Sequence, residues 1–285
     1  MDIVEIKAYA KVNLALDVVR RLENGYHEVK MIMQSVGIYD TISLQKTEQG
    51  IWLTSDSKEV PLNENNLIYK AARLMQETYG IKQGVAIHLV KRIPVSAGMA
   101  GGSTDAAAVL RGMNELFHLK QPKEKLMAQG AKLGADVPYC VLGGTALACG
   151  IGEQLTALPN MPDCFILVAK PDLSVSTRYV YENLNLAGLR SHPDMEGMVT
   201  AIQEGSLHGI IDRMSNVLES VTEKEYSVIT RIKQFMKENG ALMALMSGSG
   251  PTVFGIYDSE GEAQLAKEKL SGYHLAKQIF VTKPV

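Results

Sequence analysis

The sequence predicts an α+β protein built from two domains, and three observations lead to that prediction. A long stretch near the start alternates apolar and polar side chains, as a half-buried strand does. A later alternating stretch runs directly into a glycine-rich loop and an alanine-rich helix. The last part of the chain follows the order strand, glycine turn, strand, helix, strand. At 285 residues, the chain is long enough for two domains and a substantial core.

The first strand is expected over residues 4–18, where apolar side chains occupy every second position. This alternation predicts a strand with one buried face. Lys11 and Asn13 then share the opposite, polar face, because side chains two residues apart point the same way. Short strands at residues 41–46 and 51–54 are expected in the same sheet.

A helix is expected from Leu67 to Tyr79, because apolar side chains recur there at helical spacing. Asn65 or Asn66 is placed to cap its start, and Gly80 is placed to end it. The other expected elements are strands at residues 85–93, 165–169 and 276–281, a strand–turn–strand unit at residues 242–257, and helices at residues 106–117, 123–133 and 262–270.

The loop Pro94–Thr104 is a candidate anion site. Its glycines let backbone N–H groups approach a ligand closely, and the next helix, which Ser103 or Thr104 can cap, adds free N–H donors and a positive dipole end. These features suit a di- or triphosphate. The Walker lysine is missing, since Gly102 runs into Ser103, and the glycine spacing does not fit a dinucleotide-dependent oxidoreductase. A glycine turn before an ordinary helix is the alternative.

Glycines and prolines accumulate over residues 150–164, which predicts a break between domains. We therefore expect one domain over residues 1–155 and a second over residues 156–285. The first contains the loop Pro94–Thr104, and the second contains another glycine turn, Met246–Thr252. Binding sites favour domain interfaces, where such loops can converge.

Composition excludes several classes of function. The formal net charge of −2 gives no basic field for nucleic acid, and no apolar run reaches the length of a membrane span. The first residues lack the features of a signal peptide. Cys140, Cys149 and Cys164 have no metal-type spacing and are expected to be reduced packing residues. We expect a cytoplasmic monomer or homodimer without a metal site of its own.

Asp136 and Lys11 are candidate catalytic residues. Asp136 lies in the turn Gly134–Pro138, where a carboxylate can act as a general base or can accept local backbone hydrogen bonds. Lys11 is either a solvated surface lysine or a group that stabilises charge on a transferred phosphoryl group. Tyr26 and His27 follow a turn, where they can stack on and hydrogen-bond a ring-bearing ligand or pack as a loop.

Taken together, these segments resemble the GHMP kinases, a superfamily that includes galactokinase, homoserine kinase and mevalonate kinase. The stretch from Pro94 to Ala108 is similar to the family motif Pro-x-x-x-Gly-Leu-Gly/Ala-Gly-Gly-Ser-Ser-Asp-Ala-Ala, and Met246–Phe254 is similar to its C-terminal glycine loop. Further segments resemble, in order, those members that phosphorylate a cytidylylated methylerythritol: Ala8–Leu16, Asn24–His27, Asp40–Ile42, Asn66–Ile68 and Gly134–Pro138. Met99, Ala100, Thr104 and Pro251 depart from the usual residues without removing a proposed catalytic group.

The resemblance implies a fold and a reaction. The fold has an N-terminal domain like domain 2 of ribosomal protein S5 and a C-terminal ferredoxin-like domain, with the active site in the cleft between them. The reaction is the phosphorylation of the 2-hydroxyl of the cytidylylated substrate by ATP, in the non-mevalonate route to isoprenoid precursors. Mg²⁺ is expected with ATP, because phosphoryl transfer needs its charge screened.

The resemblance also implies a role for each matching residue. Asp136 would take the hydroxyl proton, and Lys11 would stabilise the developing charge. The residues expected to hold ATP are Asn66, Lys91, Pro94, Val95, Ser96, Ala97, Gly98, Met99, Ala100, Gly101, Gly102, Ser103 and Thr104. The residues expected to hold the cytidylyl substrate are Asn13, Tyr26, His27, Thr177, Gly248 and Ser249, with Tyr26 stacked on the base.

Two other interpretations stay open on the same scaffold. The first is a kinase of another small alcohol, and the second is a non-catalytic nucleotide-binding sensor. Tyr26 and His27 favour the cytidylyl substrate, because an acceptor without a base needs no stacking partner. The joint presence of Lys11, Asp136 and both glycine loops favours an enzyme.

Overall fold

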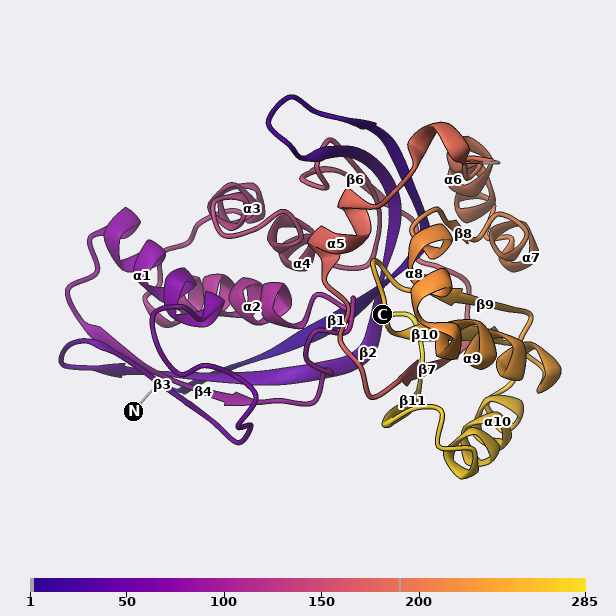
Figure 1. The fold of residues 1–285 in the computed structure, drawn as a ribbon. Helices are drawn as coiled ribbons and strands as arrows, with labels where there is room; N and C mark the ends of the chain where they lie inside the picture. Colours follow the sequence, from indigo (N-terminus) through magenta and orange to yellow (C-terminus); the bar gives the residue numbers. More distant parts are fainter. Residues whose placement is uncertain (1–2, 190) are drawn as a thin grey trace. The chain divides into compact units, whose positions relative to one another are not determined.

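Groups of strands and groups of helices follow one another along the chain in a computed structural model that describes residues 3–189 and 191–285 (Figure 1). The strands are β1 (Ile3–Arg21), β2 (His27–Thr47), β3 (Ile51–Ser55), β4 (Gly84–Val90), β5 (Thr145–Cys149), β6 (Gln154–Leu158), β7 (Phe165–Lys170), β8 (Ser215–Asn216), β9 (Met243–Met246), β10 (Val253–Tyr257) and β11 (Gln278–Thr282). The helices are α1 (Leu67–Tyr79), α2 (Gly101–Leu116), α3 (Lys123–Ala131), α4 (Val137–Leu142), α5 (Thr177–Glu182), the 3₁₀ helix η1 (Leu186–Gly188), α6 (Met195–Gln203), α7 (Leu207–Ile211), α8 (Glu219–Glu225), α9 (Ser227–Glu238) and α10 (Glu260–Gly272).

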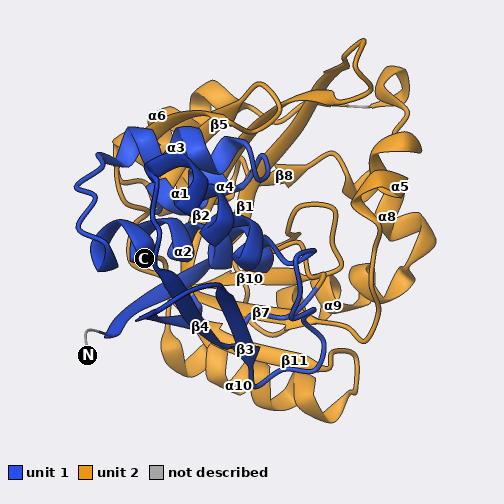
Figure 2. Ribbon diagram, turned by 90° about the vertical axis from the view of Figure 1, so that its left-hand side faces the viewer, with its two compact units in different colours: residues 1–10, 38–95, 100–143 blue, residues 11–37, 96–99, 144–285 orange. Residues whose placement is uncertain are grey.

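The chain divides into two compact units, which Figure 2 shows in different colours. Unit 1 comprises residues 1–10, 38–95 and 100–143, and unit 2 comprises residues 11–37, 96–99 and 144–285. Both β1 and β2 therefore run through the two units. The tip of the first glycine loop, residues 96–99, belongs to unit 2. The expected limit at residue 155 falls within β6, and domains over residues 1–155 and 156–285 stay a prediction.

Unit 1 packs helices against a sheet. β3 runs parallel to β4, and β4 is antiparallel to the second half of β2. α1 packs on α2, and α2 packs on α4. At Gly112 in α2, an added Cβ would clash with the Leu44 side chain of β2, so this glycine allows the helix to lie close to the sheet. The core includes Ile42, Leu44, Met75, Val85, Ile87, Leu89, Val109, Leu110 and Met113.

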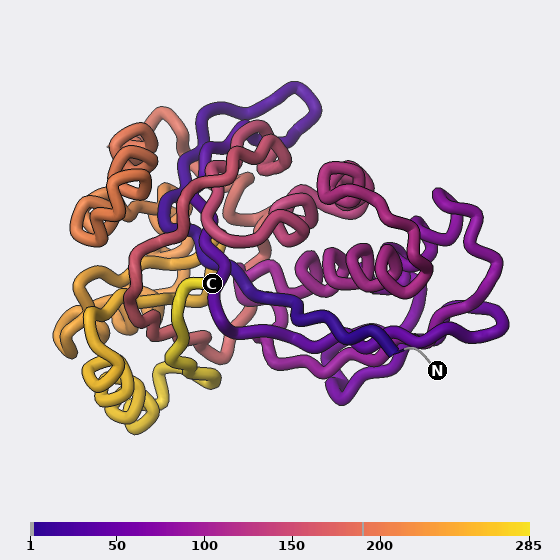
Figure 3. The backbone as a smooth tube through the Cα atoms, turned by 180° about the vertical axis from the view of Figure 1, so that it is seen from behind, coloured from indigo at the N-terminus to yellow at the C-terminus, as the bar shows by residue number. Residues whose placement is uncertain are grey.

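In unit 2, further strands of the same seven-stranded sheet pair with the continuations of β1 and β2. β5 is antiparallel to the first half of β2, β6 is antiparallel to β5, and β8 runs parallel to β1. The turn between β1 and β2 is the indigo loop at the top of Figure 3. The prediction of one buried face is wrong for residues 11–18, which are buried on both faces. Polar side chains there bond within unit 2, as Asp17 does with His192 at 2.8 Å.

The second sheet of unit 2 is antiparallel, with the order β11-β7-β10-β9. α9 and α10 pack against it (Figure 1). The apolar run that predicted a buried strand forms β7, and the expected strand–turn–strand unit forms β9 and β10. This hairpin carries the second glycine loop at its tip. The predicted α+β class is confirmed.

Two expected strands have different limits in the structure. Residues 41–46 are part of the long strand β2, and the strand expected to reach residue 93 ends at Val90. The second difference has a local cause, because the N–H groups of Arg92 and Ile93 donate to Asp40 Oδ1 instead of to a neighbouring strand. Across residues 3–189 and 191–285, no helix is long and apolar enough to cross a membrane.

Candidate functional site

Lys11 and Asn13 lie together on β1, buried in unit 2. The Lys11 residue is 5% exposed, and its Nζ donates a hydrogen bond to Asn13 Oδ1 at 2.7 Å. Asn13 Nδ2 in turn donates to Met31 Sδ at 3.5 Å. A buried ammonium usually has a carboxylate partner, yet no ion pair joins Lys11 to a residue that the structure describes. The surface-lysine interpretation is therefore wrong, and the ammonium charge is available to an anion.

The two glycine loops meet within unit 2. Ser247 Oγ donates to the Gly98 carbonyl at 2.9 Å, and the Lys11 backbone N–H donates to the Met99 carbonyl at 3.2 Å. Gly98 has a φ of +72°, and a Cβ there would clash with the Ser247 carbonyl. Gly248 has a φ of +58°, and its Cβ would lie 3.3 Å from the Gly98 carbonyl oxygen. Only glycine fits this approach without strain.

Asn216, which sequence reasoning missed, holds the second glycine loop in place. Its Nδ2 donates to the carbonyls of Met246 and Gly248, each at 2.8 Å, and its Oδ1 accepts from Leu218 N at 3.0 Å. Glu219 Oε1 accepts from Met246 N at 2.8 Å. The amide nitrogen and the amide oxygen of Asn216 are thus both engaged, in three hydrogen bonds, and the residue positions the loop.

Thr177 and Ser249 come together in unit 2, and their expected role in holding the acceptor stays a prediction. The two hydroxyl oxygens lie 2.8 Å apart within a hydrogen bond. Thr177 begins α5, where Ser176 caps the helix by accepting from Tyr179 N. A Cβ at Gly248 in the same loop would lie 3.6 Å from Asn13 Oδ1. Two of the residues expected to hold the acceptor, Thr177 and Asn13, therefore lie beside the loop that contains two others, Gly248 and Ser249.

His27 packs against a second aromatic residue, Tyr181, with their ring centroids 5.2 Å apart. Burial lowers the pKa of His27 below its usual 6.5, and the charge of Arg21 adds to this effect. The imidazole is therefore neutral at pH 7. Tyr26 beside it is 60% exposed. Tyr181 was missed from the sequence, although it lies one helical turn after Thr177 and thus on the same face of α5.

The start of α2 leaves backbone N–H groups free in unit 1. The N-cap is Ala100, with a φ of +57°, and no side chain caps the helix. The prediction of a Ser103 or Thr104 cap is wrong, because Thr104 is buried and its Oγ1 donates to the Tyr9 carbonyl at 2.7 Å. The first intrahelical bond runs from Thr104 N to the Ala100 carbonyl, so the N–H groups of residues 101–103 precede it. Such donors suit a phosphate.

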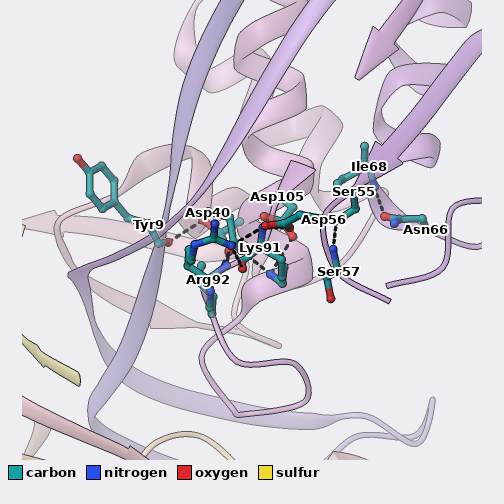
Figure 4. A network of polar contacts seen from close by, with 12 residues as sticks. Tyr9, Asp40, Ser55, Asp56, Ser57, Asn66, Ile68, Lys91, Arg92 and Asp105 are labelled. Carbon is teal, nitrogen blue, oxygen red and sulfur yellow. Dashed lines mark hydrogen bonds and ion pairs between the residues drawn. The ribbon is translucent and has the colours of Figure 1, made fainter. Parts of the chain in front are cut away.

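Lys91 lies in a buried group of three charged residues that we call the charged cluster: Asp40, Lys91 and Asp105 (Figure 4). Lys91 Nζ pairs with Asp40 Oδ2 and lies 3.1 Å from Asp105 Oδ2. Burial raises the pKa of Asp105 to about 8. The neighbouring Asp40 carboxylate adds to this rise, whereas the Lys91 ammonium lowers the pKa. The ammonium of Lys91 is thus committed to two carboxyl groups, and its expected contact with adenosine stays a prediction.

Asn66 caps α1, as the sequence predicted. Its Oδ1 accepts from Ile68 N at 2.8 Å, and its Nδ2 donates to the Pro61 carbonyl at 2.7 Å (Figure 4 shows the cap). Both ends of the amide are therefore used within unit 1. The expected role of Asn66 in holding ATP stays a prediction.

Asp136 lies between α3 and α4 in unit 1 and is partly buried. It occupies the N-cap position of α4, but its side chain makes no capping hydrogen bond. The turn is instead closed by the backbone, with Val137 N donating to the Gly134 carbonyl at 3.1 Å. The carboxylate therefore does not cap α4. The alternative interpretation, a carboxylate that accepts local backbone hydrogen bonds, required such a contact.

No group of three His, Cys, Asp or Glu residues within the described ranges is arranged to hold a metal ion. Mg²⁺ that acts with a nucleotide is typically held by one or two carboxylates together with phosphate oxygens. Mg²⁺ that arrives with ATP therefore does not require such a group of three residues. Cys140, Cys149 and Cys164, which all lie in the described ranges, form no disulfide, and burial raises the pKa of Cys164 to about 12, so its thiol is protonated.

Two family profiles match the chain. The one described as GHMP kinases N terminal domain matches residues 66–144, and the one described as GHMP kinases C terminal matches residues 198–275. The first match includes the start of α2 and Asp136. The second includes Asn216 and the glycine loop that it holds.

Curated relatives match nearly the whole chain. A 4-diphosphocytidyl-2-C-methyl-D-erythritol kinase of Lachnoclostridium phytofermentans is 52% identical over 99% of this chain and 98% of its own. One of Acetivibrio thermocellus is 48% identical over the full length of both chains. A crystal structure of 4-(cytidine 5'-diphospho)-2C-methyl-D-erythritol kinase has a TM-score of 0.85 at 32% identity, with 99% of each chain covered. A homoserine kinase from Cytophaga hutchinsonii shares the fold, with a TM-score of 0.79 at 20% identity over 99% of this chain and 95% of its own.

Proposed function

Since this chain belongs to the GHMP kinases, and within them to the 4-diphosphocytidyl-2-C-methyl-D-erythritol kinases, we propose that it phosphorylates the 2-hydroxyl of 4-diphosphocytidyl-2-C-methyl-D-erythritol with ATP. The products are the 2-phosphate and ADP. Relatives described by this activity match the chain from end to end at about half identity, which supports the same substrate here.

The observation that carries the proposal is the buried ammonium of Lys11, whose side-chain partner is the neutral amide of Asn13. The backbone of Lys11 also bonds to the tip of the first glycine loop, at Met99. Catalysis of phosphoryl transfer is mainly positioning and charge stabilisation. A desolvated cation that pairs with no carboxylate in the described part of the chain, fixed beside the glycine loop, is suited to that task.

In the proposed reaction, the 2-hydroxyl oxygen attacks the γ-phosphorus of ATP, and the bond from that phosphorus to the bridging oxygen of ADP breaks. Asp136 takes the hydroxyl proton, and Lys11 stabilises the charge on the transferred group. Mg²⁺, arriving as Mg-ATP, screens the phosphate charges. The free N–H groups of residues 101–103 and the glycine-rich segment before them bind the phosphates.

Unit 2 carries the residues proposed for the acceptor. Tyr26 stacks on the cytosine, and His27 and Asn13 hydrogen-bond the cytidylyl part. Thr177, Gly248 and Ser249 complete this set, and Tyr181 packs behind His27. A neutral His27 supports the assignment, because an uncharged imidazole both donates and accepts a hydrogen bond.

The oligomeric state and compartment follow the sequence-based expectation in this proposal: a monomer or homodimer in the cytoplasm. Cysteines that form no disulfide are consistent with a reducing compartment.

The reaction is tested by incubating the purified chain with Mg-ATP and 4-diphosphocytidyl-2-C-methyl-D-erythritol and identifying the product by phosphorus NMR and mass spectrometry. The expected product carries one added phosphoryl group, on the oxygen of the tertiary carbon. Phosphorylation of another hydroxyl would contradict the proposed regiochemistry. ATP binding without any phosphorylated product would favour the sensor interpretation.

A further inference from the structure

The charged cluster joins the two ends of the first glycine loop (Figure 4). Lys91 follows β4 and precedes the loop, whereas Asp105 lies in the first turns of α2, after the loop. Asp40 on β2 links both to the sheet by accepting from Lys91 Nζ and from the N–H groups of Arg92 and Ile93. The cluster therefore fixes the loop's entry and exit within unit 1.

The two carboxyl groups of the cluster are not equivalent. Asp40 is fully buried and accepts from three donors, two of them backbone N–H groups. Asp105 is 3% exposed and accepts a hydrogen bond from Lys91 Nζ, and its buried Oδ1 has no hydrogen-bond partner among the residues that the structure describes. One ammonium cannot neutralise two buried carboxylates, and an ionised oxygen without a donor is costly in such a place.

We propose that Asp105 carries a proton in the working enzyme, so that the charged cluster has no net charge. The cluster then positions the glycine loop without adding negative charge beside the phosphates. Asp105 is then a positioning residue that acts through Lys91. The effect on ATP rests on the proposed function, but the proton on Asp105 does not. The charged groups that act on Asp105 are Lys91 after β4 and Asp40 from β2. Burial favours the protonated form, and Asp40 does so both by its charge and by a side-chain hydrogen bond, whereas Lys91 favours the ionised form without reversing the rise in pKa.

The proton has a consequence for the dependence of stability on pH. The pKa of Asp105 is raised from 3.8 to about 8 in the folded chain. Between these values the folded state holds a proton that the unfolded chain releases, so the stability of the folded state falls as the pH rises through this window. Asp105→Asn cannot release a proton, and this part of the pH dependence disappears in that variant.

The test compares the wild-type chain with Asp105→Asn, in which a neutral amide replaces a neutral acid of the same shape. In urea unfolding from pH 4 to pH 9, the midpoint of the variant minus that of the wild type should increase with pH up to about pH 8. Above that pH the difference should stay constant. A wild-type-minus-variant infrared spectrum at pH 7 should contain the carbonyl stretch of a protonated carboxylic acid.

In kinase assays at pH 7, KM for ATP of the wild type and of Asp105→Asn should agree within about twofold. Above pH 8 it should rise in the wild type only.

Asp40→Asn is the matched control, since it makes the same change at the carboxyl group with three donors. It should lower the urea midpoint and raise KM for ATP at pH 7, because the new amide nitrogen faces the Lys91 ammonium. The proposal would be overturned if the difference in urea midpoint between wild type and Asp105→Asn did not vary with pH. It would also be overturned if the infrared difference spectrum lacked the carboxylic acid band. The unfolding and infrared readouts need no turnover, so failure of the proposed kinase activity would be seen separately.

Discussion

The Ser247 hydroxyl donates a hydrogen bond to the carbonyl of Gly98 at 2.9 Å, across 149 positions of sequence. This bond fastens the glycine loop of the C-terminal hairpin to the tip of the loop that precedes α2. Gly98 has no room for a Cβ at the same contact. The loop tip thus lies close to the backbone of Ser247. A second hydrogen bond, from the Lys11 backbone N–H to the Met99 carbonyl, also holds the tip in place.

Ser247→Ala is expected to loosen this contact without disturbing the fold. A hydrogen bond of this kind contributes about 1 kcal/mol, so KM for ATP should rise roughly fivefold while the variant stays folded. Steady-state kinetics and a thermal unfolding scan measure the two effects. Ser271→Ala is the control, because its hydroxyl bonds only within the exposed end of α10. Equal kinetic effects in both variants would contradict the role of Ser247.

Gly98→Ala and Gly102→Ala should separate folding from ATP binding. An alanine at Gly98 would need a left-handed φ and would clash with the Ser247 carbonyl, and the variant should lose about 2 kcal/mol or more of unfolding free energy.

At Gly102, which lies in α2, a Cβ would lie 3.7 Å from Leu67 Cδ1, an ordinary van der Waals contact. That variant should fold normally but bind ATP more weakly, because the methyl group occupies space beside the free N–H groups. Unfolding curves and calorimetric ATP titrations check both. Unchanged ATP affinity in Gly102→Ala would argue against phosphate binding there.

Asn216→Asp tests whether donation by the amide holds the second loop. The change keeps the size of the side chain but turns a donor toward the carbonyls of Met246 and Gly248 into an acceptor. We expect a loss of about 2–4 kcal/mol in unfolding free energy and weaker binding of both substrates. Asn183→Asp, at an exposed helix end with one donated bond, should cost less than about 1 kcal/mol. Similar losses in the two variants would show that Asn216 has no special part.

Local patterns predicted much of the fold, because they depend on neighbours in sequence. The Asn66 cap, the buried run of β7 and the β9–β10 hairpin follow from short-range signals. Asn13 and Lys11 were placed side by side by the strand period alone. Their burial was not predicted, because it depends on partners such as Met31 that lie elsewhere in the chain.

Contacts between distant segments limited the prediction of the site. Asn216 lies in a two-residue strand, and nothing near it in sequence indicates that it bonds to a loop 30 residues later. The α2 cap was misplaced for a related reason, since Thr104 uses its hydroxyl on the Tyr9 carbonyl. The partners of Lys91 likewise come from β2 and α2.

Tyr26→Ala should weaken binding of the cytidylyl acceptor with little effect on ATP. Stacking of an aromatic side chain on a base contributes about 1–3 kcal/mol, which corresponds to a rise of roughly 5- to 150-fold in KM for the acceptor. Tyr273→Ala is the control, because that tyrosine is also exposed but packs against Phe235 instead. An unchanged KM for the acceptor in Tyr26→Ala would contradict the stacking role.

The proposed activity should be measured as ADP release from Mg-ATP with four acceptors: the cytidylyl-methylerythritol, mevalonate, homoserine and galactose. We expect release with the cytidylyl acceptor alone, and a fall in kcat of about 100-fold or more in Asp136→Asn, with ATP binding retained. Release with a different acceptor, or full turnover in Asp136→Asn, would contradict this expectation.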